Sequence, residues 1–167
     1  HTAIRRQRQM CIRDRALASG LKDHDGPAIV VLDAADLNMG AFDSFETLIP
    51  VAREHGAWVH VDGAFGLFAR ASRAKRQHAA GLEAADSWST DAHKWLNVPF
   101  DCGMVFVRDS AAHRAAMTVS ASYIAPADAA RDQIDWNPEW SKRSRGIALY
   151  AALRELCLLY TSDAADE

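Results

Sequence analysis

Apolar residues in the first half of the chain form two short runs separated by one helical stripe. Residues 28–32 (AIVVL) and 57–62 (AWVHVD) are short and rich in β-branched side chains, which is typical of buried strands. Between these runs, one helical face collects Phe45, Leu48, Ile49 and Ala52. A strand, a helix and a strand in this order predict a right-handed βαβ unit in a parallel sheet.

Polar and conformationally restricted residues mark the ends of this predicted helix. Asp43 or Ser44 can cap its first turn, and Gly56 favours a stop after its last turn. Pro50 falls inside the apolar stripe, where it removes a backbone donor and favours a kink.

The second half of the chain continues the alternation with shorter elements. Residues 67–85 read as helical or irregular, and their basic stretch at 70–76 follows no helical spacing, which favours a solvated surface. We expect strands at 86–90 and 103–109, a helix at 111–117 opened by Asp109 or Ser110, a loop at 119–138, and an amphipathic helix at 140–156 weakened at Gly146. This order of elements predicts an α/β fold.

Composition is that of an ordinary globular protein with one domain. The chain has 167 residues, of which 49% are hydrophobic and 25% charged, and its net charge of −3 argues against a nucleic-acid-binding protein. No apolar run approaches the roughly 20 residues that cross a bilayer. The N-terminal residues lack the apolar core of a signal peptide, so we expect a cytoplasmic protein with no membrane partner.

The two ends of the chain differ from the rest. Residues 1–15 are strongly basic and residues 157–167 are acidic, and both segments resemble translations of a transposon-type sequencing adapter, read in opposite directions. The other interpretation of the basic end is an arm that grips phosphates. We exclude both ends from the fold and expect residues 16–156 to be a partial domain. Cys102 is then the one remaining cysteine, so no disulfide is expected.

Two short segments carry the candidate chemistry. In HVDGAFG at 60–66, Asp62 closes a strand where α/β sheets bind their ligands, although it could instead cap the next helix. In TDAHKWLNVPFDCG at 90–103, Lys94 lies between His93 and apolar neighbours. A desolvated lysine can form a Schiff base, whereas the alternative is a surface lysine with its stem over Trp95.

Other polar residues give weaker signals. His60, Asp62 and His93 could be read as metal ligands, but no pair of them has the spacing of a known metal motif, so we expect no metal. Tyr123 lies in a Ser/Ala/Pro loop and is either an exposed aromatic or a mobile proton donor.

Together, HVDGAFG and TDAHKWLNVPFDCG resemble the pyridoxal-phosphate-dependent group II amino acid decarboxylases, over nearly all of residues 27–156. The resemblance implies a fragment of the large domain of a fold-type-I enzyme, with a mostly parallel sheet flanked by helices. It also implies that the cofactor is pyridoxal 5′-phosphate and that the parent protein decarboxylates an L-amino acid as a homodimer. Alternative hypotheses are another fold-type-I activity, such as an aminotransferase or a desulfurase, and an inert α/β fragment.

The resemblance also implies a role for individual residues. Lys94 would form the covalent link to the cofactor aldehyde, and Asp62 would pair with the pyridine nitrogen and keep it protonated. Ala64 would pack against one face of the ring. His93 would contact the phosphate or the bound substrate, and Asp91 would lie near the phosphate.

Outside the two motifs, Tyr123 would be the mobile-loop proton donor, and Arg143 or Arg145 would have a structural role. The chain departs from the family pattern where Ala34 and Ala35 replace an Ala-Gly pair. If that position needs a positive φ, Ala35 is strained by about 1–2 kcal/mol. Met39 stands where a small or polar residue is common, and Lys142 replaces an arginine. The part of the family domain that supplies most of the phosphate contacts has no counterpart in this sequence, so we expect the isolated chain to be inactive.

Overall fold

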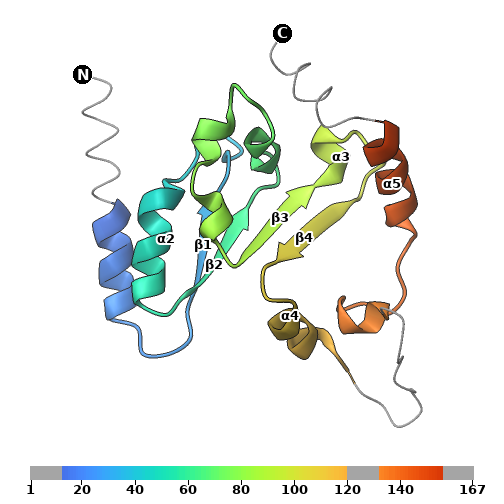
Figure 1. Ribbon diagram of the computed structural model, residues 1–167. Coiled ribbons are helices and arrows are strands. Elements are labelled where there is room, and N and C mark those ends of the chain that lie inside the picture. Colours follow the sequence, from blue (N-terminus) through green and yellow to red (C-terminus); the bar gives the residue numbers. More distant parts are fainter. Residues whose placement is uncertain (1–12, 120–131, 156–167) are drawn as a thin grey trace.

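Four short strands form one sheet at the centre of the computed structural model, which describes residues 13–119 and 132–155 (Figure 1). The strands are β1 (Ile29–Asp33), β2 (Trp58–Asp62), β3 (Ser87–Asp91) and β4 (Gly103–Val107), and they lie in the order β1-β2-β3-β4. β1, β2 and β3 are parallel, and β4 pairs antiparallel with β3. The predicted α/β fold with a mostly parallel sheet is therefore confirmed.

One face of β1 and β2 is covered by α2 (Phe45–Glu54), the predicted helix. The helix buries the four residues of the predicted stripe, which pack in one core with Val30, Leu32, Val59 and Val61. A second helix over residues 13–22 runs beside α2 (Figure 1), and its Leu17 and Leu21 pack against the same core. Residues 13–15 of this helix belong to the segment that we excluded from the fold, and Arg13 pairs with Asp43 at 2.7 Å.

The residues at the start of α2 have separate roles. Ser44 occupies the N-cap position, and its hydroxyl is bonded to the Thr47 hydroxyl at 2.9 Å. Asp43 instead accepts a hydrogen bond from the backbone amide of Asp33 at 2.8 Å, which fastens the β1–α2 loop to the end of β1. Pro50 lies inside α2, as predicted, and the helix continues through it.

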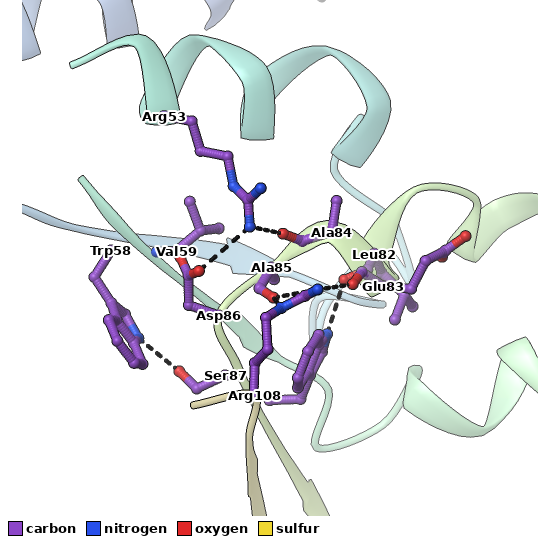
Figure 2. A network of polar contacts seen from close by, with 11 residues as sticks. Arg53, Trp58, Val59, Leu82, Glu83, Ala84, Ala85, Asp86, Ser87 and Arg108 are labelled. Carbon is purple, nitrogen blue, oxygen red and sulfur yellow. Dashed lines mark hydrogen bonds and ion pairs between the residues drawn. The ribbon is translucent and has the colours of Figure 1, made fainter. Parts of the chain in front are cut away.

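At the amino end of β3, a polar network joins three elements (Figure 2). Asp86 accepts a hydrogen bond from the Val59 amide at 2.8 Å and pairs with Arg53 of α2 at 3.3 Å. Arg108, just after β4, donates to the Ala85 carbonyl at 3.0 Å and also to the Glu83 carbonyl. The loop before β3 is thus tied to both neighbouring strands and to α2, which fixes the register of β3.

Short elements complete the described part of the chain. Residues 67–85, predicted as helical or irregular, form isolated 3-10 turns, and the basic stretch is largely exposed, as expected. The remaining elements are η1 (Leu67–Arg70), η2 (Arg76–Ala79), η3 (Leu82–Ala84), α3 (Ala92–Trp95), α4 (Ser110–Met117), η4 (Gln133–Asp135) and α5 (Arg145–Glu155). Asp109 caps α4 by accepting from the amides of Ala111 and Ala112, as predicted.

The last helix differs from its prediction at its start and in its faces. Residues 140–144 are not helical, and α5 begins at Arg145, where both Arg143 and Arg145 are bonded to Asp101. One face of α5, with Ala148, Leu149 and Ala152, packs near β4, whereas Ile147 and Tyr150 remain 72% and 66% exposed. The helix therefore has two apolar faces, so the amphipathic prediction was wrong.

The second face of the sheet carries a row of polar side chains that no described helix covers. His60 is bonded through Nδ1 to the Ser87 hydroxyl at 2.8 Å and through Nε2 to the Ser89 hydroxyl at 3.2 Å. Trp58 donates to the same Ser87 hydroxyl at 2.9 Å. Ile29 and Val31 flank this row and are 71% and 60% exposed.

Replacing Ala35 by glycine should stabilise the fold. Ala35 has φ 65°, the left-handed conformation that costs a side-chain-bearing residue about 1–2 kcal/mol. Glycine removes this strain, but the greater entropy of its unfolded chain costs about 0.5–1 kcal/mol. We therefore expect the free energy of unfolding, measured in urea, to rise by up to about 1 kcal/mol. Ala41→Gly, in the same loop but without a positive φ, is the matched control and should lose stability. Equal effects of the two substitutions would contradict the strain at Ala35.

Acidification should weaken the fold through His60. Burial lowers the pKa of His60 below its usual value, and the nearby Asp62 carboxylate offsets part of this effect. Below a pH of about 6.5 the unfolded chain therefore binds more protons than the native one, and the free energy of unfolding falls as the pH falls. In urea unfolding at pH 7.5 and 5.5, His60→Gln should lose less stability on acidification than the native chain. The same loss in both proteins would refute this role.

Candidate active site

The carboxyl ends of the three parallel strands lie along one edge of the sheet. Asp33 at the end of β1 is in register with Asp62 at the end of β2, and β3 ends at Asp91. Lys94 follows three residues later, on α3. Because ligands bind at the carboxyl ends of strands in open α/β sheets, this edge is the candidate site.

A tight turn after β2 holds Asp62 in place. One carboxylate oxygen of Asp62 accepts a hydrogen bond from the Ala64 amide at 3.0 Å. Gly63 donates to the Ser89 carbonyl at 2.9 Å, and Gly66 donates to the Ala34 carbonyl at 3.0 Å. A Cβ atom on Gly66 would lie 2.4 Å from that carbonyl oxygen, so only glycine allows this approach. Among the described residues, none donates a hydrogen bond to the second oxygen of Asp62.

Lys94 is held by a carboxylate and by an aromatic ring. Its Nζ lies 2.8 Å from Asp91 Oδ2 and 3.7 Å from the centre of the Phe65 ring. The indole of Trp95 donates to the Phe65 carbonyl, which fastens α3 to the turn that carries Asp62. The ammonium therefore rests on the Phe65 ring, and the Lys94 side chain is 27% exposed.

Asp62, Ala64 and Lys94 line one hollow of about 850 Å³. Ala35, Met39 and Phe65 also contribute to its wall. The structure thus brings together three of the residues named from the sequence. Asp91 and His93 adjoin Lys94 without lining the hollow, and Tyr123 lies outside the described residues.

The hollow is rich in carboxylates. Burial raises the pKa of Asp33, and the charges of Asp43, Asp62 and Asp36 raise it further. Asp36 behaves in the opposite way, because the backbone amides of its own loop, led by that of Met39, lower its pKa. Arg13 faces these acids but is paired with Asp43. The site as described therefore offers carboxylates and one amine, with few free donors for an anion.

His93, next to Lys94, is held by the backbone of Cys102 and by the Phe100 ring. Its Nδ1 lies 3.0 Å from the backbone nitrogen of Cys102, and its ring meets the edge of Phe100 at 4.5 Å between centres. Its Nε2 faces Asp91 Oδ2 at 3.8 Å. Cys102 is a buried free thiol next to Asp101.

Sequence reasoning missed several residues that shape this site. Phe65 was quoted within a motif but given no role, and Asp33 and Asp36 were not considered as part of the site. Asp101 was also given no role, although Arg145 donates two hydrogen bonds of 3.0 Å to it and lowers its pKa. Its place in the FDCG segment was the only signal.

His60, Asp62 and His93 do not form a metal site in the described part of the chain, where no three His, Cys, Asp or Glu side chains are grouped as ligands. His60 is bonded instead to two serines, and His93 to the Cys102 backbone. Within residues 13–119 and 132–155, no helix is long and apolar enough to span a bilayer.

Comparison with known proteins gives one consistent family. A family model described as the pyridoxal-dependent decarboxylase conserved domain matches residues 8–158. The chain is 32% identical to an aromatic-L-amino-acid decarboxylase of Drosophila lebanonensis over 143 residues, which are 84% of this chain and 36% of that protein. It is 29% identical to a phenylacetaldehyde synthase of Arabidopsis thaliana over 132 residues, 77% of this chain and 27% of that protein.

A solved structure extends the likeness to the fold. The chain superposes on Oryza sativa TDC, solved with PLP and tryptamine, with a TM-score of 0.81 and 25% identity. The match covers 92% of this chain and 32% of that one, so this chain spans about a third of such proteins. With the family model matching most of its length, the chain belongs to the pyridoxal-dependent decarboxylase family.

Proposed function

We propose that the parent protein removes the α-carboxylate of an L-amino acid, with pyridoxal 5′-phosphate as its cofactor. The observation that carries this proposal is that the Lys94 amine and the Asp62 carboxylate line one hollow at the carboxyl edge of the sheet. Family membership supports the same activity. Because the chain spans only about a third of its relatives, we assign the activity to the whole parent and expect the isolated chain to be inactive.

The residues of the hollow fit this cofactor in part. A primary amine, a carboxylate with a free oxygen and the small side chain of Ala64 are what the aldehyde, the pyridine nitrogen and the flat face of its ring require. The carboxylates that line the hollow do not suit its phosphate. The phosphate must therefore be held mainly by parts of the parent beyond this chain, with His93 and Asp91 at its margin.

When bound, the cofactor would withdraw the electrons released as carbon dioxide leaves. Lys94 would carry the covalent link, which requires its amine to leave Asp91 and lose a proton. Asp62, held by the Ala64 amide, would keep a proton on the ring nitrogen through its free oxygen. Ala64 would leave room for the ring, and we assign proton delivery to the product to Tyr123.

Alternative reactions with the same cofactor differ in the product that they release. The Arabidopsis relative is named as an aldehyde synthase, and aminotransferases of this fold class produce a keto acid. The FDCG segment after Lys94 and the tyrosine at position 123 favour decarboxylation to an amine. The name of the fly relative makes an aromatic L-amino acid the first substrate class to test.

We further propose that the parent is a cytoplasmic homodimer. The resemblance to group II decarboxylases supports the dimer, and the free thiol of Cys102 agrees with a reducing compartment. Residues 16–156 would form the partial cofactor-binding domain, with residues 1–15 and 157–167 derived from an adapter. Sequencing the source DNA across both junctions tests these boundaries.

Product analysis of the full-length parent tests the proposed activity. With a carboxyl-labelled aromatic amino acid and the cofactor, we expect one carbon dioxide and one amine for each amino acid consumed. Lys94→Ala should reduce the release of carbon dioxide and amine below detection, because no other amine lines the described hollow. Lys75→Ala, at an exposed lysine, is the matched control. Release of a keto acid or an aldehyde in place of the amine would overturn the proposed reaction.

Cofactor binding to the parent tests the role of Asp62. Asp62→Asn keeps the acceptor for the Ala64 amide but removes the charge opposite the ring nitrogen. A charged hydrogen bond contributes about 1.5–3 kcal/mol, so the cofactor Kd should rise about tenfold or more. Asp36→Asn is the control, because Asp36 lines the same hollow with its carboxylate bound by backbone amides. An unchanged Kd for Asp62→Asn would exclude this role.

A further inference from the structure

A backbone amide decides which ring nitrogen of His93 carries the proton. The Cys102 amide points at His93 Nδ1 over 3.0 Å, and the Cys102 carbonyl oxygen lies 3.3 Å from the same nitrogen. Both residues are shielded from solvent, because the His93 side chain is 14% exposed and Cys102 is 3% exposed. The two contacts make opposite demands on Nδ1, which would have to accept in one and donate in the other.

Only one tautomer satisfies every group around this contact. If Nδ1 is bare, it accepts from the Cys102 amide, and the Cys102 carbonyl still accepts from the Ala92 amide at 2.8 Å. If Nδ1 carries the proton, the buried Cys102 amide faces a second donor and loses its acceptor, which is a costly arrangement. The contacts therefore favour the tautomer with its proton on Nε2.

The Cys102 amide is itself held in place from α5. Arg145 donates from Nε and Nη2 to the two oxygens of Asp101, each at 3.0 Å, and Asp101 directly precedes Cys102. Arg143 reaches the same carboxylate with a single contact of 3.3 Å and is far more exposed. A bond pair in this planar geometry fixes orientation as well as distance, so Arg145 is the main anchor of residues 101–102.

We propose that Arg145, through its two hydrogen bonds to Asp101, orients the Cys102 amide so that it donates to His93 Nδ1. His93 is thereby held in the tautomer that donates from Nε2. Arg145 is thus a positioning residue for His93, although it lies on a different element from Lys94. The Nε2–H faces the Asp91 carboxylate at 3.8 Å, on the side of Lys94. The tautomer does not depend on the proposed function. Only the use of the Nε2 donor, to bind an anionic group of the cofactor or substrate, rests on it.

Nuclear magnetic resonance of the 15N-labelled 167-residue chain, without cofactor, tests the tautomer directly. A scalar coupling through the hydrogen bond between the Cys102 amide nitrogen and His93 Nδ1 arises only when Nδ1 accepts. We expect this coupling, together with an Nδ1 shift typical of a bare nitrogen. A protonated Nδ1 without the coupling would overturn the proposal.

Variants on α5 test the anchor. Arg145→Gln should abolish the coupling and speed hydrogen exchange of the Cys102 amide at least tenfold. Arg154→Gln, on the same helix with no hydrogen bond or ion pair to the described residues, should match the native chain. If Arg145→Gln does not fold, Arg145→Lys keeps the charge without the paired geometry and should still speed the exchange. Native-like exchange in whichever of these Arg145 variants folds, or the same acceleration in Arg154→Gln, would overturn the role of Arg145.

These measurements separate the inference from the proposed function. The coupling and the exchange rate need no cofactor, so they report only on how the chain holds His93. Failure of Lys94 to react with pyridoxal phosphate would leave the His93 result standing, and a protonated Nδ1 would leave the chemistry of Lys94 standing.

Discussion

Parallel pairing of β2 on both of its sides is the constraint on which the site depends. It aligns Asp62 with Asp33 on one neighbour and with Ser89 on the other, so three strand ends share one edge. Gly63 and Gly66 then let the next turn approach β3 at Ser89 and the loop after β1 at Ala34. A side chain at either glycine would push the turn away and move Asp62 off the edge. Lys94, distant in the sequence, shares a hollow with Asp62 because of this pairing.

The two ends of the sheet have different tasks. At the amino ends, Asp86, Arg53 and Arg108 satisfy backbone groups and tie β3 to β2, β4 and α2 (Figure 2). At the carboxyl ends, carboxylates gather without enough cations to neutralise them, and burial and mutual repulsion raise the pKa of Asp33. Carboxylates with perturbed pKa values cluster at functional sites, whereas the contacts at the amino ends join elements of the fold.

The sequence predicted what depends on local periodicity and missed what depends on distant contacts. The buried stripe of α2 and the Asp109 cap follow from spacing alone, and both were confirmed. Family resemblance indicated the strain at Ala35, which has a positive φ. The predicted start of the last helix was wrong, because Arg145 and Arg143 bind Asp101, which is far away in the sequence. The contact of His93 with the Cys102 amide was missed for the same reason, since it forms only when β4 folds back on β3.

The most direct test of the account is whether Lys94 reacts with pyridoxal phosphate. The purified chain and the full-length parent would each be mixed with the cofactor, scanned in the visible range, reduced with borohydride and mapped by peptide mass spectrometry, beside Lys94→Ala. We predict a cofactor-dependent band in the parent that reduction fixes onto Lys94 and that the variant lacks. An adduct spread over surface lysines of the parent, or one that persists in Lys94→Ala, would contradict it.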